Sequence, residues 1–163
     1  MEAEGWILVL AGDFNIARSR IDGYPSLREW PQQHCLNRAD FNRKFFEDDK
    51  GLRAVDVWRT LKGDERRYTY HPRGVKWGSS CDRVDYAIAS RRLVDVGGLV
   101  DAGILDSPQE RGPSDHVPIW IEVRMPRRDK GGMEGERDGN DNEEDRAPPR
   151  KCRKAPDDSS LAS

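Results

Sequence analysis

The last 39 residues of this chain cannot contribute to a packed core, which confines the fold to the residues before them. Residues 125–163 carry nine Lys/Arg and ten Asp/Glu, no aromatic residue and almost no aliphatic one. Such a segment buries too little apolar area to offset the entropy cost of ordering it, so we expect it to be disordered. All five Trp, four Tyr and four Phe lie earlier. The sequence therefore predicts one domain within residues 1–124 and a disordered charged tail over residues 125–163.

Charge and cysteine content exclude several classes of protein. The net charge is −2, so no basic field marks a tight nucleic-acid binder, although an enzyme can hold a few phosphates locally. Cys35, Cys81 and Cys152 are widely spaced, which indicates reduced thiols, an intracellular location, and neither a disulfide framework nor a zinc site. The apolar run over residues 6–11 is too short for a signal peptide or a membrane span.

Hydrophobic patterning predicts a mixture of short strands and helices. Asn37 as the N-cap and Gly51 as the stop delimit an expected helix over residues 37–50. Residues 16–36 lack periodicity and are expected to form a long loop. A short strand followed by a helical piece is expected over residues 52–61. The other expected strands cover residues 6–11 (buried), 67–71, 83–89, 93–104 and 117–123. The predicted class is α/β or α+β with short, partly antiparallel strands.

The first strand is followed by two polar side chains suited to phosphate chemistry. Asp13 and Asn15 come two and four positions after the apolar run, and residues two apart in an extended segment point the same way. A carboxylate there can orient or deprotonate a water, and an amide can donate to a phosphoryl oxygen. The same Gly-Asp-x-Asn pattern is also typical of an Asx turn, so both interpretations stay open.

A second pair of such side chains opens the last strand. Asp115 and His116 are adjacent, so their side chains diverge and take different roles: Asp115 facing a hard cation, His116 facing a phosphate. An imidazole also needs a second group to fix its tautomer, and Asp85 on a neighbouring strand is the candidate. A capping or turn Ser-Asp-His in a surface loop is the alternative.

Two further residues are candidates for contact with a substrate. Arg83 can brace the cleft or touch a phosphate, or it can be a structural ion-pair partner of Asp82 or Asp85. Tyr70, with Tyr68, can line the floor of a substrate site, or both can pack in the core.

The remaining histidines and several tryptophans are given structural interpretations. His71 is expected to be a surface residue before a turn, and His34 to be structural. Trp30, Trp58 and Trp77 are expected to pack or to anchor loops.

Four segments, taken in order, resemble the endonuclease/exonuclease/phosphatase superfamily, the DNase I-like group. They are LVLAGDFN, RYTYHP, SCDRVDYAIAS and SDHVPIWIEV, and they span residues 8–123. The resemblance implies a two-sheet α/β sandwich with a site at one edge. It also implies a divalent metal, Mg²⁺ or Mn²⁺, and hydrolysis of phosphodiester bonds in nucleic acid.

The resemblance also implies a role for each matching residue. Asp13 would position or activate the attacking water and lie near the metal, with Asp115. Asn15 would hold the scissile phosphate. Asp85 would orient His116, which would stabilise charge on phosphorus or transfer a proton.

The chain departs from this family in length. Family domains are much longer, and their first half carries an Asn, a metal-binding Glu and a Tyr or His that have no counterpart here. We therefore expect only the C-terminal half of the fold, with about one sheet, an exposed apolar inner face, and weak or absent activity in isolation.

The identity of one residue bears on the substrate. Repair-type members carry an aromatic residue that packs on the abasic sugar where this chain has Asp82, which disfavours an abasic-site specialist. Inositol-polyphosphate phosphatases share the Cys-Asp-Arg segment, but they usually have Leu in place of Phe14 and a hydrophobic residue in place of Asp85. The balance favours a nuclease-like protein.

Two alternatives to a nuclease remain open. One is a phosphomonoesterase of the same fold acting on a phosphorylated small molecule or lipid, and the other is a non-catalytic remnant. Nucleic acid is the expected partner of a complete protein, in the nucleus or cytoplasm. Nothing in the sequence indicates a membrane or an obligate protein partner.

Overall fold

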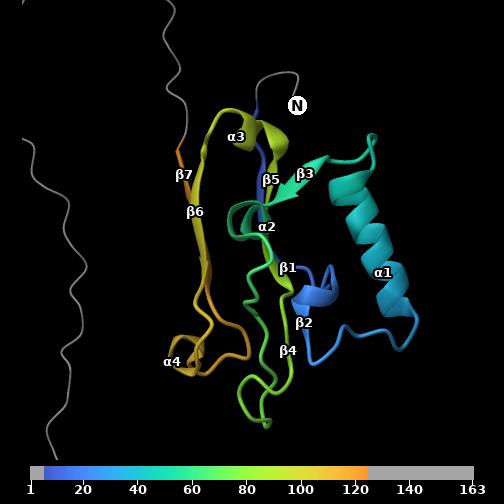
Figure 1. The fold of residues 1–163 in the computed structure, drawn as a ribbon, viewed down its shortest axis with the longest axis vertical. Coiled ribbons are helices and arrows are strands. Elements are labelled where there is room, and N and C mark those ends of the chain that lie inside the picture. The colour runs from blue at the N-terminus through green and yellow to red at the C-terminus, as the bar shows by residue number, and fades with distance from the viewer. Residues whose placement is uncertain (1–5, 125–163) are drawn as a thin grey trace, which may run out of the picture. The chain divides into compact units, whose positions relative to one another are not determined.

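The structure, a computed structural model, describes residues 6–124, in which short strands and short helices alternate (Figure 1). The strands are β1 Val9–Asp13, β2 Gly23–Tyr24, β3 Ala54–Asp56, β4 Cys81–Asp82, β5 Asp85–Ser90, β6 Leu99–Ile104 and β7 Ile119–Val123. The helices are η2 Arg20–Asp22, α1 Gln33–Asn42, η3 Arg43–Glu47, α2 Val57–Lys62, α3 Arg91–Asp95 and α4 Pro108–Arg111. The predicted mixture of helices and strands is confirmed. The tail predicted over residues 125–163 lies outside the described residues.

The central sheet is built around β5, with β1 and β3 pairing antiparallel on its two sides. Along β5 the side chains alternate between the two faces of the sheet, as a strand requires. Tyr86 and Ile88 pack into one hydrophobic cluster, and Ala87 and Ala89 pack into another. A strand with apolar residues on both faces is buried on both, so β5 is covered from each side.

Aromatic residues of α1 and η3 cover the Tyr86 face of the sheet. Phe41 is buried there, and its ring centroid lies 4.7 Å from that of Phe45 and 5.7 Å from that of Tyr86. Phe14, just after β1, joins the same cluster. Phe41 and Phe45, four positions apart, therefore lie on the same face of the α1–η3 segment.

The other face of the sheet packs against α2, α3 and β6, through Val57, Trp58, Leu93 and Ala102. In Figure 1 the antiparallel β6–β7 hairpin lies on the opposite side of the central sheet from α1. This arrangement gives the described residues three layers with β5 in the middle one. No helix among residues 6–124 is both long and apolar enough to traverse a bilayer.

A buried cluster of charges ties together segments that are distant in sequence. The Arg83 side chain is 1% exposed; its Nε donates to Asp22 at 2.7 Å and its NH2 group to Asp56 at 2.6 Å. Arg59 also donates to Asp22, and Arg18 to Asp56. Burial alone would raise the pKa of Asp22, but Arg83, Ser19 and Arg59 together hold it below its ordinary value.

These contacts correct two expectations for Arg83. Its ion-pair partners are Asp22 and Asp56, and neither of the predicted partners, Asp82 and Asp85, pairs with it within the described residues. Its guanidinium is also buried and fully engaged, so the predicted contact with a substrate phosphate is not supported. The role of Arg83 is to hold η2, the end of β3 and the β4–β5 junction together.

The boundaries of the first helix differ from the prediction. Helix α1 begins at Gln33 instead of Asn37, and it continues as a π-helical turn to Glu47. Gly51 is not its stop, because the helix ends at Asp48, which has extended backbone angles. The expected loop over residues 16–36 is also wrong in part, since it contains η2, β2 and the first turn of α1.

Three expected strands also differ from the structure. Residues 67–71 form no strand; Tyr70 instead makes isolated bridges to Asp82 and His116. Residues 93–104 divide into the end of α3 and β6, separated by Gly97, whose φ of 64° favours glycine. The first strand is not buried, because β1 is at the edge of the described sheet and most of its residues are exposed.

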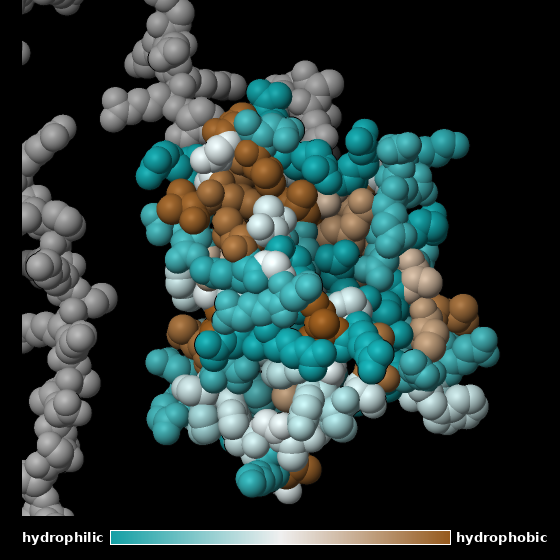
Figure 2. Space-filling model, viewed as in Figure 1, coloured by the Kyte–Doolittle hydropathy of each residue, from teal (hydrophilic) through white to brown (hydrophobic). Residues whose placement is uncertain are grey.

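Apolar side chains remain exposed within the described residues. Figure 2 shows them gathered over the upper end of this face, near α3 and β6, whereas the lower part is mostly hydrophilic. A hollow of about 300 Å³ elsewhere is lined by apolar residues that include Trp6, Leu8, Leu10 and Ile88. The uncovered inner face of a sandwich stays a prediction.

Candidate functional site

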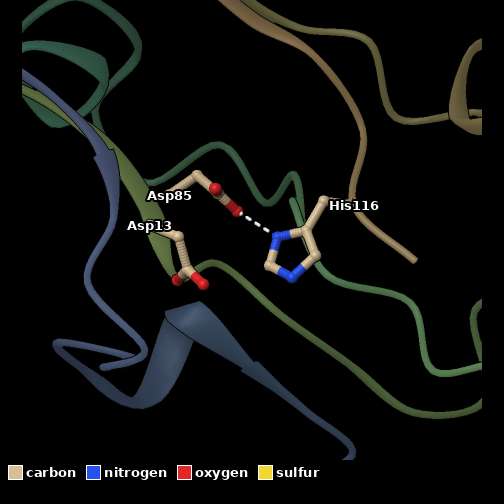
Figure 3. A group of neighbouring side chains, drawn as sticks. All are labelled: Asp13, Asp85 and His116. Atoms are coloured by element: carbon tan, nitrogen blue, oxygen red, sulfur yellow. Dashed lines mark hydrogen bonds and ion pairs between the residues drawn. The ribbon is translucent and has the colours of Figure 1, made fainter. Parts of the chain in front are cut away.

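Three side chains from distant parts of the sequence meet at one end of the central sheet. Asp13 ends β1, Asp85 begins β5 directly opposite it, and His116 lies in the segment before β7. One carboxylate oxygen from Asp13, one from Asp85 and one ring nitrogen of His116 all lie within 4.8 Å of one another. Figure 3 shows both carboxylates beside the imidazole ring.

The imidazole is held by Asp85. Nδ1 of His116 lies 2.8 Å from Oδ2 of Asp85, so a proton on Nδ1 is donated to the carboxylate and Nε2 is left as the free nitrogen. The hydroxyl of Thr69 accepts hydrogen bonds from the backbone N–H groups of Val84 and Asp85 at 3.0 Å each, which fixes the start of β5. Tyr70 packs against the histidine, with 5.2 Å between the ring centroids.

The first motif forms an Asx turn as well as part of the site. The backbone N–H of Asn15 donates to Oδ1 of Asp13 at 2.8 Å, and Asn15 has a φ of 55°. The expectation of an extended segment through both residues is therefore wrong, since the strand ends at Asp13. The turn nevertheless leaves Asn15 lining a polar pocket that also contains His116, so the two interpretations of the motif are compatible.

That pocket has a volume of about 280 Å³ and lies beside the three-residue group. Four of the predicted site residues line it: Asn15, Tyr70, Asp115 and His116. Asp115 is not part of the group formed by Asp13, Asp85 and His116, so its role toward a metal stays a prediction.

Four polar residues of the pocket were missed by the sequence analysis: Arg28, His34, Asn37 and Arg38. His34 was expected to be structural. These residues lie in and beside a segment interpreted as a loop, where no periodicity indicates which side chains share a surface. His34, Asn37 and Arg38 are at positions i, i+3 and i+4 of α1, so they lie on one face of that helix. A correct prediction of where α1 begins would have grouped them.

His71 is not the surface residue that was expected. It is 3% exposed, its Nε2 lies 2.9 Å from Asp106, and its ring stacks on Trp77 with 3.6 Å between centroids. Burial favours a higher pKa for Asp106, but its hydrogen bonds with His71 and with the Tyr68 N–H hold that pKa below its usual range. His71 and Trp77 thus form a packed structural unit on the far side of Tyr70.

The other tryptophans divide between the core and the surface. Trp58 is buried, and its indole N–H donates to the backbone carbonyl of Glu65. Trp30 is 83% exposed, so the expectation that it packs or anchors a loop is wrong.

The donor set of the three-residue group fits a divalent cation. Asp13 and Asp85 offer carboxylate oxygens, and Mg²⁺ is commonly held by one or two carboxylates together with waters and substrate phosphates. Among the described residues, only one oxygen of Asp13 accepts a hydrogen bond, from Asn15. The second oxygen of Asp13 and Oδ1 of Asp85 accept no hydrogen bond among the described residues, so both could bind a metal ion.

Comparison with known proteins gives matches at the level of structure. No family model matches the sequence, and neither does any curated protein. The Xenopus laevis APE2 catalytic domain is similar at 22% identity with a TM-score of 0.59, over 76% of this chain and 38% of that domain. A Leishmania major AP endonuclease, LMAP, is similar at 24% identity with a TM-score of 0.58, over 72% of this chain and 35% of that one.

A third solved structure is similar at slightly higher identity. It is a Neisseria 3′ phosphatase, NExo, bound to a product DNA hairpin, at 26% identity with a TM-score of 0.56. The match covers 73% of this chain and 46% of that one. The chain thus spans less than half the length of each of these structures.

Proposed function

We propose that this chain, which has the DNase I-like fold of the endonuclease/exonuclease/phosphatase superfamily, hydrolyses phosphodiester bonds in nucleic acid. The similar structures support this proposal, since one is described as an AP endonuclease and another as a 3′ phosphatase bound to product DNA. Because a shared fold does not fix function, the proposal depends on the site itself.

The observation that carries the proposal is the contact between His116 and Asp85. A histidine fixed at 2.8 Å by a carboxylate, with a second carboxylate from Asp13 beside it, is an arrangement suited to proton transfer and to binding a charged oxygen. A purely structural ion pair would not need the third group or the adjoining polar pocket.

The chemistry follows from the position of each group. Asp13 orients the attacking water and takes up its proton as the new P–O bond forms; the ester P–O bond breaks, and the leaving alkoxide takes a proton from solvent. In its imidazolium form, His116 donates from Nδ1 to Asp85 and from Nε2 to the phosphate, where it stabilises the charge that builds on the non-bridging oxygens. The Asn15 amide donates to another of these oxygens. Such donors are already in place before reaction, so they stabilise the transition state without reorganisation.

A divalent metal is part of this proposal. Asp13 would hold Mg²⁺ or Mn²⁺, with Asp115 nearby. When bound, the ion would supply positive charge to a phosphate oxygen.

We further propose that turnover by this chain is weak. Within the described residues, only two carboxylates lie beside His116, and one oxygen of each is already engaged, by the Asn15 N–H on Asp13 and by the imidazole on Asp85, so a metal ion there would be held loosely. An enzyme of this kind would act inside the cell, in the nucleus or cytoplasm, where the free thiols of Cys35 and Cys81 stay reduced.

The test is hydrolysis by the whole chain with Mg²⁺ or with EDTA. Supercoiled plasmid and fluorescent oligonucleotides are the nuclease substrates. An oligonucleotide with a 3′-phosphate is included because one similar structure is described as a 3′ phosphatase. Inositol polyphosphates test the small-molecule alternative.

Slow Mg²⁺-dependent cleavage of nucleic acid that disappears in His116→Ala supports the proposal. Asp95→Asn, an exposed substitution in α3, is the matched control and should keep the activity. Phosphate release from inositol polyphosphates with no attack on nucleic acid would favour the alternative, and no hydrolysis at all would favour a non-catalytic protein.

A further inference from the structure

One short backbone segment holds His116 from both sides. The N–H of His71 donates to the carbonyl of Asp115 at 2.8 Å. The N–H of Val117 donates to the carbonyl of Thr69, also at 2.8 Å. Because these two bonds flank His116 in sequence, they fix its backbone relative to Thr69. Both bonds are made by the main chain, so neither depends on the identity of a side chain.

The side chain of Thr69 holds the other member of the pair, Asp85. Its Oγ1 atom accepts the N–H groups of Val84 and Asp85, at 3.0 Å each. Successive N–H groups in a regular strand point toward opposite neighbours, so one neighbouring strand cannot accept both. The chain is irregular here, between the end of β4 at Asp82 and the start of β5, and the hydroxyl satisfies both groups at this break. Thr69 is 0% exposed, so bulk water does not take the place of its hydroxyl.

Thr69 therefore links both members of the pair formed by Asp85 and His116. Nδ1 of His116 lies 2.8 Å from Oδ2 of Asp85, and this distance depends on how the segment before β7 lies relative to the start of β5. The carbonyl of Thr69 is bonded to the first of these through Val117, and its hydroxyl is bonded to the second. Only the bonds to the hydroxyl depend on the side chain, so one substitution can loosen Asp85 while the backbone of His116 stays held.

We propose that Thr69 is a positioning residue of this site, whose hydroxyl sets the distance between Asp85 and His116 and thereby the turnover rate. The inference rests on the proposed function. Thr69 is not among the residues that line the polar pocket, so it acts on His116 through Asp85 and not on the substrate. Loss of the hydroxyl should therefore lower kcat and leave KM close to its wild-type value. A misplacement of about 1 Å can cost about 10²-fold in rate, and this is the size of effect expected.

Kinetics of two substitutions at Thr69 test the proposal with the whole chain and a fluorescent oligonucleotide. Thr69→Val removes the hydroxyl with little change in size, and kcat should fall by about 10²-fold. Thr69→Ser keeps the hydroxyl and should keep the wild-type kcat. Thr60→Val is the matched control, since Thr60 is the other threonine of the chain and its hydroxyl donates to the carbonyl of Asp56, within α2. This control should keep both kcat and KM.

NMR of the histidine ring nitrogens tests the positioning without turnover. The ring shifts report which nitrogen of the neutral imidazole carries the proton, and His116→Ala assigns the signals of His116. In the wild type and in Thr69→Ser we expect the proton on Nδ1, where Asp85 accepts it. In Thr69→Val we expect this preference to be lost although circular dichroism shows a folded chain. A threonine that only stabilised the fold would lower the melting temperature without changing the tautomer.

An unchanged kcat in Thr69→Val, or a His116 tautomer that this substitution leaves unchanged, would overturn the inference. If Thr69→Val does not fold, amide hydrogen exchange in the wild type decides. Protection of the N–H groups of Val84 and Asp85 supports the inference, and exchange as fast as that of exposed N–H groups overturns it.

Failure of the inference is distinguishable from failure of the proposed function. Cleavage that requires His116 but is unaffected by Thr69→Val leaves the function standing and removes Thr69 from it. A His116 tautomer that depends on Thr69, in a chain that hydrolyses nothing, supports the positioning of the pair by Thr69 and removes the function.

Discussion

The Nδ1 atom of His116 and the Oδ2 atom of Asp85 lie 2.8 Å apart, although the two residues are 31 positions apart in sequence. The contact is possible because β5 begins at Asp85 and because Tyr70 bridges to the backbone of His116. Asp13 is opposite Asp85 in the register of β1 and β5. Strand register therefore brings the two carboxylates together beside the imidazole.

Asp85→Asn tests whether this contact positions the histidine. The amide keeps the size of the carboxylate but not its charge, so it no longer selects the tautomer with the proton on Nδ1. We expect the cleavage rate to fall by a factor of about 10²–10⁴, the range for a lost acid–base function. Circular dichroism should show an unchanged melting temperature. A rate close to that of the Asp95→Asn control would remove Asp85 from the mechanism.

Asp13→Asn separates the turn from the chemistry. The side-chain oxygen of asparagine still accepts the N–H of residue 15, so the Asx turn and the stability should be kept. The negative charge is lost, so we expect turnover to fall by a factor of about 10²–10⁴. The measurement is the initial rate at saturating Mg²⁺, compared with the thermal midpoint of the same preparation. Unchanged turnover would assign Asp13 to the turn alone.

Arg83→Met tests the buried charge cluster. The substitution leaves the buried carboxylates of Asp22 and Asp56 without their main partner. Breaking a buried pair from one side costs about 3–5 kcal/mol. Arg67→Met, in an exposed ion pair with Glu65, should cost at most about 1 kcal/mol. Urea unfolding followed by tryptophan fluorescence measures both, and equal losses for the two variants would contradict the structural role of Arg83.

The lowered pKa of Asp22 predicts a dependence of stability on pH. The pKa of Asp22 in the folded state is below the ordinary value of 3.8. The contribution of Asp22 to the free energy of unfolding is therefore fully present above pH 3.8. It is lost as the pH falls from there through the folded-state value. The free energy of unfolding, measured from neutral pH downward, should therefore fall less steeply below pH 3.8 in Asp22→Asn than in the wild type.

Asp40→Asn is the control for this pH dependence. The pKa of Asp40 is also lowered, by hydrogen bonds with Lys44 and Arg43, but Asp40 is exposed, so solvent screens its contribution. Its replacement should leave the pH profile close to that of the wild type. Identical profiles for the wild type and Asp22→Asn would contradict the assignment.

The sequence predicted those parts of the structure that depend on local pattern. The alternation along residues 83–89 indicated a strand, and β5 covers most of that range. The adjacency of Asp115 and His116, with Asp85 on a neighbouring strand, indicated a site that the structure assembles around Asp13, Asp85 and His116. Such patterns are informative because a strand's period of two fixes which side chains share a face.

Long-range contacts could not be predicted in this way. The partners of Arg83 are 61 and 27 positions away, and nothing near Arg83 in sequence distinguishes Asp22 and Asp56 from other acids. The start of α1 was missed because Gln32 makes no side-chain cap, and this error hid the pocket lining formed by His34 and Arg38. Burial of His71 depends on Trp77 and Asp106, which only the fold brings to it.

Asp13, Asp85 and His116 are proposed to form a hydrolytic site for nucleic acid. The most direct measurement is the rate at which the whole chain cleaves a fluorescent oligonucleotide with Mg²⁺, compared with the same chain carrying His116→Ala. We predict slow cleavage by the wild type, abolished by EDTA and reduced to background in the variant. Cleavage that His116→Ala retains, or a wild-type rate no higher than background, would contradict the claim.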